Sequence, residues 1–136
     1  MRYLLDTHAF LWLAEDDPRL DANVRALFSD ASNEIFLSAA SVWEMAIKAS
    51  LGKLVLATPL ARLVAGGVER GIQLLAVSCD HAYQIELLPF HHRDPFDRLL
   101  VAQASHGGMQ LVSRDPKLDA YPAIRVWDRV YAKSPV

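Results

Sequence analysis

Cysteine is almost absent from this chain of 136 residues, with Cys79 as its single example. An intrachain disulfide is therefore excluded, and folding cannot depend on an oxidising compartment. Long hydrophobic runs are missing as well, because no apolar stretch approaches the roughly 20 residues that span a bilayer. Asp6 and His8 interrupt the apolar stretch 3–14, and acidic residues follow it where a signal peptide would need small ones. We therefore expect a cytoplasmic protein with no membrane contact.

A strong excess of one charge is also absent. The chain has 14 Lys and Arg against 16 Asp and Glu, which gives a formal net charge of −2. A strong non-specific nucleic-acid binder usually carries a large basic excess, so that class of protein is disfavoured. About half of the residues (52%) are apolar, which suits a folded globular protein and argues against disorder. The length predicts one domain that covers residues 1–136.

The chain does contain a regular alternation of short apolar runs and segments with helical spacing. Strands are expected at 2–5, 34–37, 72–77, 109–112 and 124–127. Helices are expected at 7–14, 21–28, 41–51, 59–70, 78–88 and 94–107. Strands separated by helices indicate an α/β fold, with a central parallel sheet of four to five strands flanked by helices.

Four carboxylates fall at equivalent places in this pattern. Each comes just after an expected strand or in the first turn of an expected helix: Asp6, Glu44, Asp97 and Asp115. In a parallel sheet with returning helices, these places share the edge where the strands end, which is also where such sheets usually bind ligands. Four negative charges in one crevice disfavour each other's ionisation unless a cation lies among them. The sequence therefore predicts an acidic, cation-binding crevice.

Local structural roles compete with this interpretation. The run 41–44, Ser-Val-Trp-Glu, fits a capping box in which the glutamate returns to the helix N-terminus. Asp94 fits an N-cap, and Asp97 then lies where an acid favours the helix dipole. Asp115 precedes a proline and fits the start of a turn. Asp6 is harder to explain structurally, because an acid between an apolar strand and an apolar helix is partly buried and needs a partner.

The joint arrangement favours a metal site over four separate caps. Hard oxygen ligands without a supporting Cys or His cluster suit Mg²⁺ or Mn²⁺ and not zinc. A carboxylate-held divalent ion that meets a phosphate and an activated water is the usual equipment for phosphodiester hydrolysis. Leaving the four clustered acids aside, 12 of the 16 acids remain against 14 Lys and Arg, so the rest of the surface is mildly basic.

Four sequence runs resemble the PIN-domain ribonucleases, and more narrowly the VapC toxins of bacterial toxin–antitoxin pairs. The runs are 4–12 (LLDTHAFLW), 41–48 (SVWEMAIK), 92–100 (HRDPFDRLL) and 111–115 (LVSRD). They occur in the family's order, the likeness continues to about Trp127, and the Asp-Pro-Phe-Asp-Arg run is the most specific. One departure is Ser113-Arg114-Asp115, which stands where Thr-x-Asp or Thr-Asp is commoner.

The resemblance implies a PIN-like fold and a metal-dependent endoribonuclease that acts as the toxin of such a pair. It implies that Asp6, Glu44, Asp97 and Asp115 are the catalytic, metal-binding carboxylates. Accessory roles follow for three further residues: Asp94 near the metals, and the hydroxyls of Thr7 and Ser113 as groups that orient a carboxylate or a water. The implied partners are an RNA substrate, a cognate VapB-like antitoxin and a second copy of the chain in a homodimer.

Basic residues near these runs are candidates for binding RNA phosphates. They are Arg98, Lys48, Arg93, Arg114 and Lys117, with Arg98 preferred because it follows Asp97 directly.

Among the rings, His91 and His92 are expected to face substrate or solvent, because a zinc site needs more ligands. His8 fits a core position or a substrate contact equally well, and Trp12 and Trp43 are expected to pack.

Three other functions remain open from the residues. A structure-specific DNA nuclease could use the same metal site. A phosphatase with an aspartyl nucleophile is disfavoured, because the run Asp6-Thr7-His8 lacks a second aspartate two residues on. A non-catalytic module could use the acids to hold a structural cation or a basic peptide. Binding of metal without turnover of RNA would favour the module.

Overall fold

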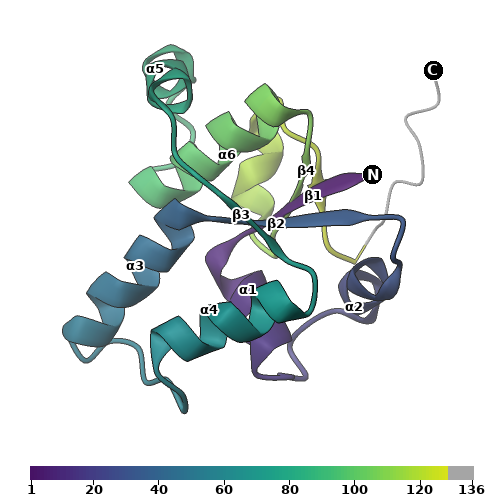
Figure 1. Cartoon of the computed structure of the whole chain (residues 1–136). Coiled ribbons are helices and arrows are strands. Elements are labelled where there is room, and N and C mark those ends of the chain that lie inside the picture. Colours follow the sequence, from purple (N-terminus) through teal and green to yellow (C-terminus); the bar gives the residue numbers. More distant parts are fainter. Residues whose placement is uncertain (129–136) are drawn as a thin grey trace.

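Five short parallel strands form one sheet at the centre of the computed structural model, which describes residues 1–128 (Figure 1). The strands are β1 (Arg2–Leu5), β2 (Glu34–Ser38), β3 (Gln73–Leu75), β4 (Gln110–Val112) and β5 (Arg125–Val126). Their order across the sheet is β3-β2-β1-β4-β5, and every neighbouring pair is parallel. The α/β class and the parallel sheet expected from the sequence are thereby confirmed.

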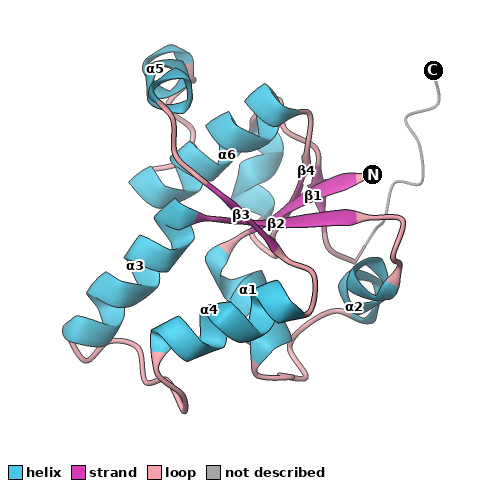
Figure 2. Ribbon diagram, viewed as in Figure 1, coloured by secondary structure: helices cyan, strands magenta, loops and turns pink. Residues whose placement is uncertain are grey.

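Helices cover both faces of this sheet (Figure 2). They are α1 (Thr7–Ala14), α2 (Ala22–Ser29), α3 (Ala39–Ser50), α4 (Leu60–Glu69), α5 (Cys79–Leu87) and α6 (Pro95–Gly107), with a short 3₁₀ helix η1 at Pro116–Ala120. In the view of Figure 1, α1 and α4 lie below the sheet, and α5 and α6 lie above it. Within residues 1–128, no helix combines the length and the apolar character that a membrane crossing requires.

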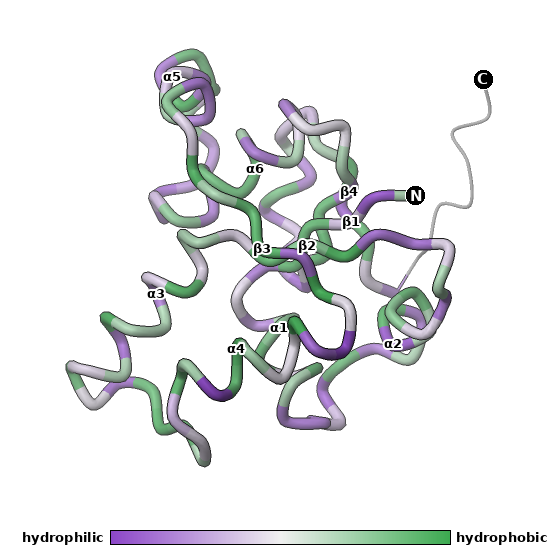
Figure 3. The backbone as a smooth tube through the Cα atoms, in the orientation of Figure 1, coloured by the Kyte–Doolittle hydropathy of each residue, from purple (hydrophilic) through white to green (hydrophobic). Residues whose placement is uncertain are grey.

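The two helical layers explain why the strands consist mainly of apolar residues. Successive side chains of a strand point to opposite faces. Tyr3 and Leu5 pack into one core with Phe10, whereas Leu4 packs into the other with Leu100. Both cores are buried, so most positions along the strands need apolar residues. Figure 3 shows this as largely hydrophobic colouring where the strands cross the middle of the molecule.

The strand order reverses direction at β1, and this places a crevice beyond the C-terminal ends of the central strands. From β1 the chain adds β2 and β3 on one side and then β4 and β5 on the other. The backbone N–H of Asp6 donates to the carbonyl oxygen of Val112 at 2.9 Å, so the ends of β1 and β4 lie side by side. Open α/β sheets bind ligands at such a switch point.

The junction between β2 and α3 differs from the expected one. Ser38 is both the last residue of β2 and the N-cap of α3, with its hydroxyl accepting from the N–H of Ala40 at 3.0 Å. The capping box expected for the run 41–44 is therefore wrong. Ser41 is buried inside the helix, and its hydroxyl has no hydrogen-bond partner among the described residues. Glu44 consequently lies in the second turn and not in the first.

Smaller differences concern element ends. The third strand is shorter than the expected 72–77, because β3 is an edge strand paired only with β2 along Gln73–Leu75. The 3₁₀ helix η1 was not expected. The end of α6 at Gly107 matches the expected helix 94–107, and Gly108 follows it with a φ of 64°, a conformation that glycine adopts without strain.

Candidate active site

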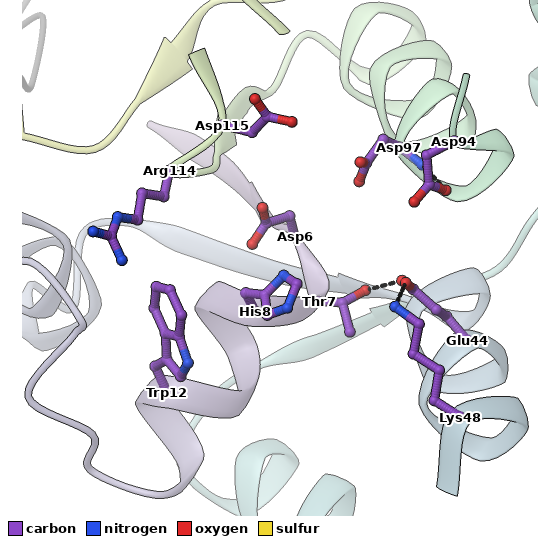
Figure 4. A pocket seen from close by; sticks show the side chains of 10 residues that line it. All are labelled: Asp6, Thr7, His8, Trp12, Glu44, Lys48, Asp94, Asp97, Arg114 and Asp115. Carbon is purple, nitrogen blue, oxygen red and sulfur yellow. Dashed lines mark hydrogen bonds and ion pairs between the residues drawn. The ribbon is translucent and has the colours of Figure 1, made fainter. Parts of the chain in front are cut away.

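One pocket of about 310 Å³ gathers the four carboxylates that were expected to converge (Figure 4). It lies beyond the C-terminal ends of β1 and β4. Its lining consists of Asp6, Thr7, His8, Trp12, Glu44, Lys48, Asp94, Asp97, Arg114 and Asp115. Residues separated by more than one hundred positions in the chain thus share one cavity, and most of its polar lining is acidic.

Asp6 is fixed by the junction between β1 and α1. It is the N-cap of α1, and its Oδ1 accepts from the N–H of Ala9 at 2.8 Å. Burial raises the pKa of the Asp6 carboxyl, although hydrogen bonds from the Ala9 N–H and the Ser113 hydroxyl act to lower it. The charge of Glu44 adds to the rise. Asp6 is therefore a buried acid whose negative charge is incompletely compensated by the protein.

Glu44 projects from α3 toward the start of α1, and both of its oxygens have protein partners. Oε1 accepts from the Thr7 hydroxyl at 2.6 Å, and Oε2 accepts from the Lys48 ammonium at 2.7 Å. Lys48 lies one helical turn after Glu44, and this hydrogen bond is the main cause of the raised pKa of the Lys48 amine. The Glu44 side chain is only 6% exposed. Its charge is thus already balanced by a neighbouring cation.

Asp94 and Asp97, at the start of α6, have different roles. Asp94 is the N-cap, and its Oδ1 accepts from the N–H groups of Phe96 at 2.9 Å and Asp97 at 3.4 Å. Asp97 therefore does not cap the helix, and its carboxylate faces the pocket (Figure 4). Burial, followed by the charges of Asp94 and Asp6, raises the pKa of Asp97 to about 7. The negative charge of Asp97, like that of Asp6, is therefore incompletely compensated by the protein.

Asp115 follows β4 and is the most accessible of the four carboxylates, with a side chain that is 34% exposed. It is the N-cap of η1, and its Oδ1 accepts from the N–H of Lys117 at 3.0 Å. Its own N–H donates to the Ser113 hydroxyl at 3.1 Å. Burial acts to raise the pKa of Asp115, but hydrogen bonds from the Lys117 N–H and from His92 outweigh it, and the pKa is lowered.

His92 contacts two of the site carboxylates, which was not expected from the sequence. It was expected to face substrate or solvent, yet its side chain is only 13% exposed. Its Nε2 lies 3.0 Å from Oδ2 of Asp115 and 3.4 Å from Oδ2 of Asp97. The only sequence signal for it was its place two residues before Asp94 in the family-like run, because loop contacts of this kind leave no periodic pattern.

Among the basic candidates, Arg98 does not reach the pocket. Its Nη2 donates to the carbonyl oxygens of Ile85 and Leu88, both at 3.3 Å, and its guanidinium lies 4.8 Å from the centre of the Phe90 ring. Arg98 thus joins α6 to the end of α5 and does not line the pocket, so these contacts give no support to the preference for it as a substrate-binding residue. The exposed side chain of Arg93 does not line the pocket either.

Arg114 and two rings form the wall of the pocket opposite Asp97. The guanidinium of Arg114 lies 5.8 Å from the centre of the Trp12 ring, and the His8 ring lies 5.7 Å from the same ring. Arg114 has no acidic partner among residues 1–128. His8 is exposed, whereas Trp12 is mostly buried, as expected. The expectation that Trp43 packs inside was wrong, because Trp43 is 62% exposed and touches Phe96 at the surface.

The donor chemistry of the pocket fits a hard divalent cation. The acids that face it offer carboxylate oxygens, and the hydroxyls of Thr7 and Ser113 lie behind them. Oxygen ligands of this kind suit Mg²⁺ or Mn²⁺. The raised pKa of Asp97 shows that the protein groups alone do not compensate the clustered charge. Asp6, Asp97 and Asp115 could hold such an ion, and Glu44 could join them by giving up its contact with Lys48.

Comparisons with known proteins agree with this architecture. The protein is 45% identical over 71 residues to Ribonuclease VapC16 of Mycobacterium tuberculosis, a match that covers 48% of this chain and 49% of that relative. The match thus spans about half of the relative's length. Among solved structures, VapBC2 of Rickettsia felis, bound to a DNA fragment from its promoter, matches with a TM-score of 0.71 and 18% identity, over 94% of this chain and 100% of the other.

A second solved structure, the sarcin-ricin-loop-cleaving toxin VapC20 of Mycobacterium tuberculosis, matches with a TM-score of 0.62 and 16% identity, over 92% of this chain and 98% of the other. At such low identities these two likenesses establish the fold alone. The family assignment comes from the sequence itself, which matches the PIN domain over residues 3–124. Nearly the whole described chain is included in that match, and the protein therefore belongs to the PIN domain family.

Proposed function

We propose that the protein is a metal-dependent endoribonuclease that hydrolyses RNA phosphodiester bonds. The observation that carries the proposal is the convergence of Asp6, Glu44, Asp97 and Asp115 on one pocket at the switch point of the sheet. Membership of the PIN domain family supports it, as do the ribonuclease name of one relative and the RNA-cleaving activity named for VapC20.

The residues of the pocket divide into groups that hold a cation and groups that position them. Mg²⁺ or Mn²⁺ bound by the four carboxylates would neutralise charge on the scissile phosphate and make an attacking water more acidic. The Thr7 hydroxyl fixes the orientation of Glu44 through its 2.6 Å hydrogen bond. Ser113 links Asp6 to the backbone of Asp115, and Asp94 fixes the start of α6.

The proposal is tested by removing and restoring the metal. Purified protein treated with EDTA is expected to lose RNA cleavage by at least about 10³-fold, a loss of roughly 4 kcal/mol of transition-state stabilisation, and to regain it in excess Mg²⁺ or Mn²⁺. A single-stranded DNA of the same sequence is the matched control. Preferential cleavage of DNA would favour the DNA nuclease. Metal binding without cleavage of either strand would favour the non-catalytic module.

Arg114 is the basic residue best placed to bind an RNA phosphate next to the scissile one. Replacement by Gln is expected to raise KM about 5-fold with little change in kcat, because one exposed charge contact contributes on the order of 1 kcal/mol. The dependence of log KM on log salt should also become weaker by about 0.7, as one phosphate contact of single-stranded RNA is lost. Both quantities come from steady-state cleavage at several salt concentrations.

Arg19→Gln is the matched control for Arg114. The Arg19 guanidinium also lies over the Trp12 ring, at 4.9 Å from its centre, but it forms an ion pair with Asp17 at 2.8 Å and does not line the pocket. KM should stay within about 2-fold for this variant. Equal effects of the two substitutions would indicate that general surface charge, and not a phosphate site at Arg114, determines KM.

We further propose that this single domain acts in the cytoplasm as the toxin of a toxin–antitoxin pair, as a homodimer inhibited by a cognate VapB-like antitoxin. The solved neighbour VapBC2, whose name joins a VapB to a VapC, supports the antitoxin partner. The test is expression of this chain alone and together with the product of any small open reading frame beside its gene. Growth arrest that co-expression relieves is expected, and light scattering of the purified chain should give twice the monomer mass.

A further inference from the structure

His92 makes an unusual set of contacts for a histidine beside carboxylates. It lies in the loop between α5 and α6, outside both helices. Its Nε2 faces Oδ2 of Asp115 at 3.0 Å and Oδ2 of Asp97 at 3.4 Å. These three residues each offer a ligand atom within 4.8 Å of the other two, a spacing that a metal ion could bridge. The contacts of Nδ1, the other ring nitrogen, decide whether Nε2 could bind a metal or instead donates a hydrogen bond.

The backbone of Asp94 determines the tautomer of this ring. Its N–H donates to Nδ1 of His92 at 3.0 Å. A nitrogen that accepts a hydrogen bond carries a lone pair and no proton, so the proton of the neutral ring is on Nε2. Nε2 therefore donates to the two carboxylates. A metal-binding histidine usually has the opposite arrangement, in which the second nitrogen donates to an acceptor and the first presents its lone pair to the metal.

The loop that carries His92 is anchored to the same segment that carries Asp115. The hydroxyl of Tyr121 accepts from the backbone N–H groups of His91 at 3.0 Å and of His92 at 2.9 Å. Tyr121 is 4% exposed and directly follows η1, the helix that Asp115 caps. The segment 115–121 therefore holds the loop at two points, through the Tyr121 hydroxyl to its backbone and through Asp115 to the ring.

From these contacts we infer that His92 is a positioning residue that holds the Asp115 carboxylate beside Asp97 by donating its Nε2 proton, and that it does not bind the metal itself. The inference rests on the proposed metal-binding function of the pocket. Asp115 needs such a support, because it is the most exposed of the four carboxylates and lies on a single 3₁₀ turn. Asp6 is placed as the N-cap of α1, Asp97 by the first turn of α6, and Glu44 by α3.

The experiment compares His92→Leu, which removes the donor, with His92→Gln, whose side-chain amide retains one. Mn²⁺ affinity is measured by calorimetry in the absence of RNA, and kcat and KM are measured separately. His92→Leu is expected to weaken Mn²⁺ binding about 10- to 100-fold, the usual effect of losing a residue that supports a metal ligand. His92→Gln should recover most of that affinity. Mn²⁺ binding by His92→Leu within about 2-fold of the original protein would overturn the inference.

A double substitution tests whether His92 acts through Asp115. In an Asp115→Asn background, His92→Leu should weaken Mn²⁺ binding by less than about 2-fold further, because the two residues then form one unit. Additive losses would overturn the inference. His91→Leu is the matched control: it belongs to the same loop and its ring packs against Tyr121 at 5.2 Å, but it lies outside the pocket. Its Mn²⁺ affinity should equal that of the original protein.

The tautomer gives a readout that is independent of activity. The ¹⁵N chemical shifts of the His92 ring in metal-free protein are expected to show a protonated Nε2 and an unprotonated Nδ1. With Mn²⁺ bound, pulsed electron paramagnetic resonance should show no directly coordinated nitrogen. A coordinated imidazole would overturn the inference. If the protein binds Mn²⁺ as described but cleaves no RNA, the proposed ribonuclease fails while the role of His92 stands.

Discussion

Asp97→Asn is expected to reduce RNA cleavage at least about 10³-fold, which corresponds to roughly 4 kcal/mol of lost transition-state stabilisation. The amide keeps the shape of the side chain but removes the charge that would bind the cation. The reason to choose Asp97 is that it lines the pocket and that burial and the charges of Asp94 and Asp6 raise its pKa to about 7. Steady-state cleavage of one defined RNA in Mg²⁺ and in Mn²⁺ measures the effect.

The matched control is Asp80→Asn. Asp80 is also an acid in the first turn of a helix, α5, but it is exposed and does not line the pocket. Cleavage by this variant should remain within about 2-fold of the original. Full cleavage by Asp97→Asn would remove Asp97 from the metal-binding set.

The melting temperature of metal-free Asp97→Asn shows whether the substitution removes only a charge or also disrupts the fold. The pKa of Asp97 is about 7 in the folded chain and near 3.8 in the unfolded chain, so the folded state binds the extra proton between these values. Ionising Asp97 therefore destabilises the metal-free protein as pH rises from about 4 to 7, by up to a few kcal/mol.

Asp97→Asn cannot ionise at this position, so its melting temperature should exceed that of the original protein at pH 8, with the difference vanishing near pH 4. Asp94 is the residue that caps α6, and it is unchanged in this variant. A lower melting temperature for Asp97→Asn at pH 8 would indicate a structural role for the carboxylate that its contacts do not reveal.

Saturating Mn²⁺ is expected to raise the melting temperature of the original protein by roughly 10 °C at pH 8. A ligand at about 100 times its dissociation constant stabilises the folded state by about 2.7 kcal/mol, and a domain of this size gains a few degrees per kcal/mol. The increase should be smaller at pH 5, because protons compete with the cation for Asp97. Thermal unfolding with Mn²⁺ and with EDTA at both pH values measures it.

Asp6→Asn and Asp97→Asn should each lose most of this increase, whereas Asp80→Asn should retain it. An equal shift in all three variants would place the stabilising ion elsewhere on the molecule.

The order of strands and helices was largely predictable, because the local sequence signals for each element agree with the fold as a whole. The bounds of β1 and α1 match the expectation, since Asp6 ends an apolar strand and caps the helix that follows. The start of α3 was not predictable from the same rules. Two serines, Ser38 and Ser41, both fit an N-cap, and only the direct passage of β2 into the helix selects the first.

The carboxylates were predictable as a group, whereas most of their neighbours were not. Arg98 follows Asp97 in sequence, but successive helical residues point in directions about 100° apart, so Arg98 faces α5 instead of the pocket. His92 acquires its role from an N–H of Asp94 and from a tyrosine 29 positions away, and neither contact has a local signature. The pairing of Lys48 with Glu44 follows helical spacing and could have been proposed from sequence.

The central place of β1 in the sheet has a consequence for the timing of biosynthesis. β1 is made before the other four strands, but one of its two neighbours, β4, begins only at Gln110, and Asp115 comes later still. A nascent chain that ends before these residues lacks one wall of the acidic pocket, whatever its other segments have already folded. If the pocket cuts RNA, this order of synthesis delays cutting until β4 and Asp115 have been made, so a nascent copy that still lacks them poses no threat to the ribosome that is making it.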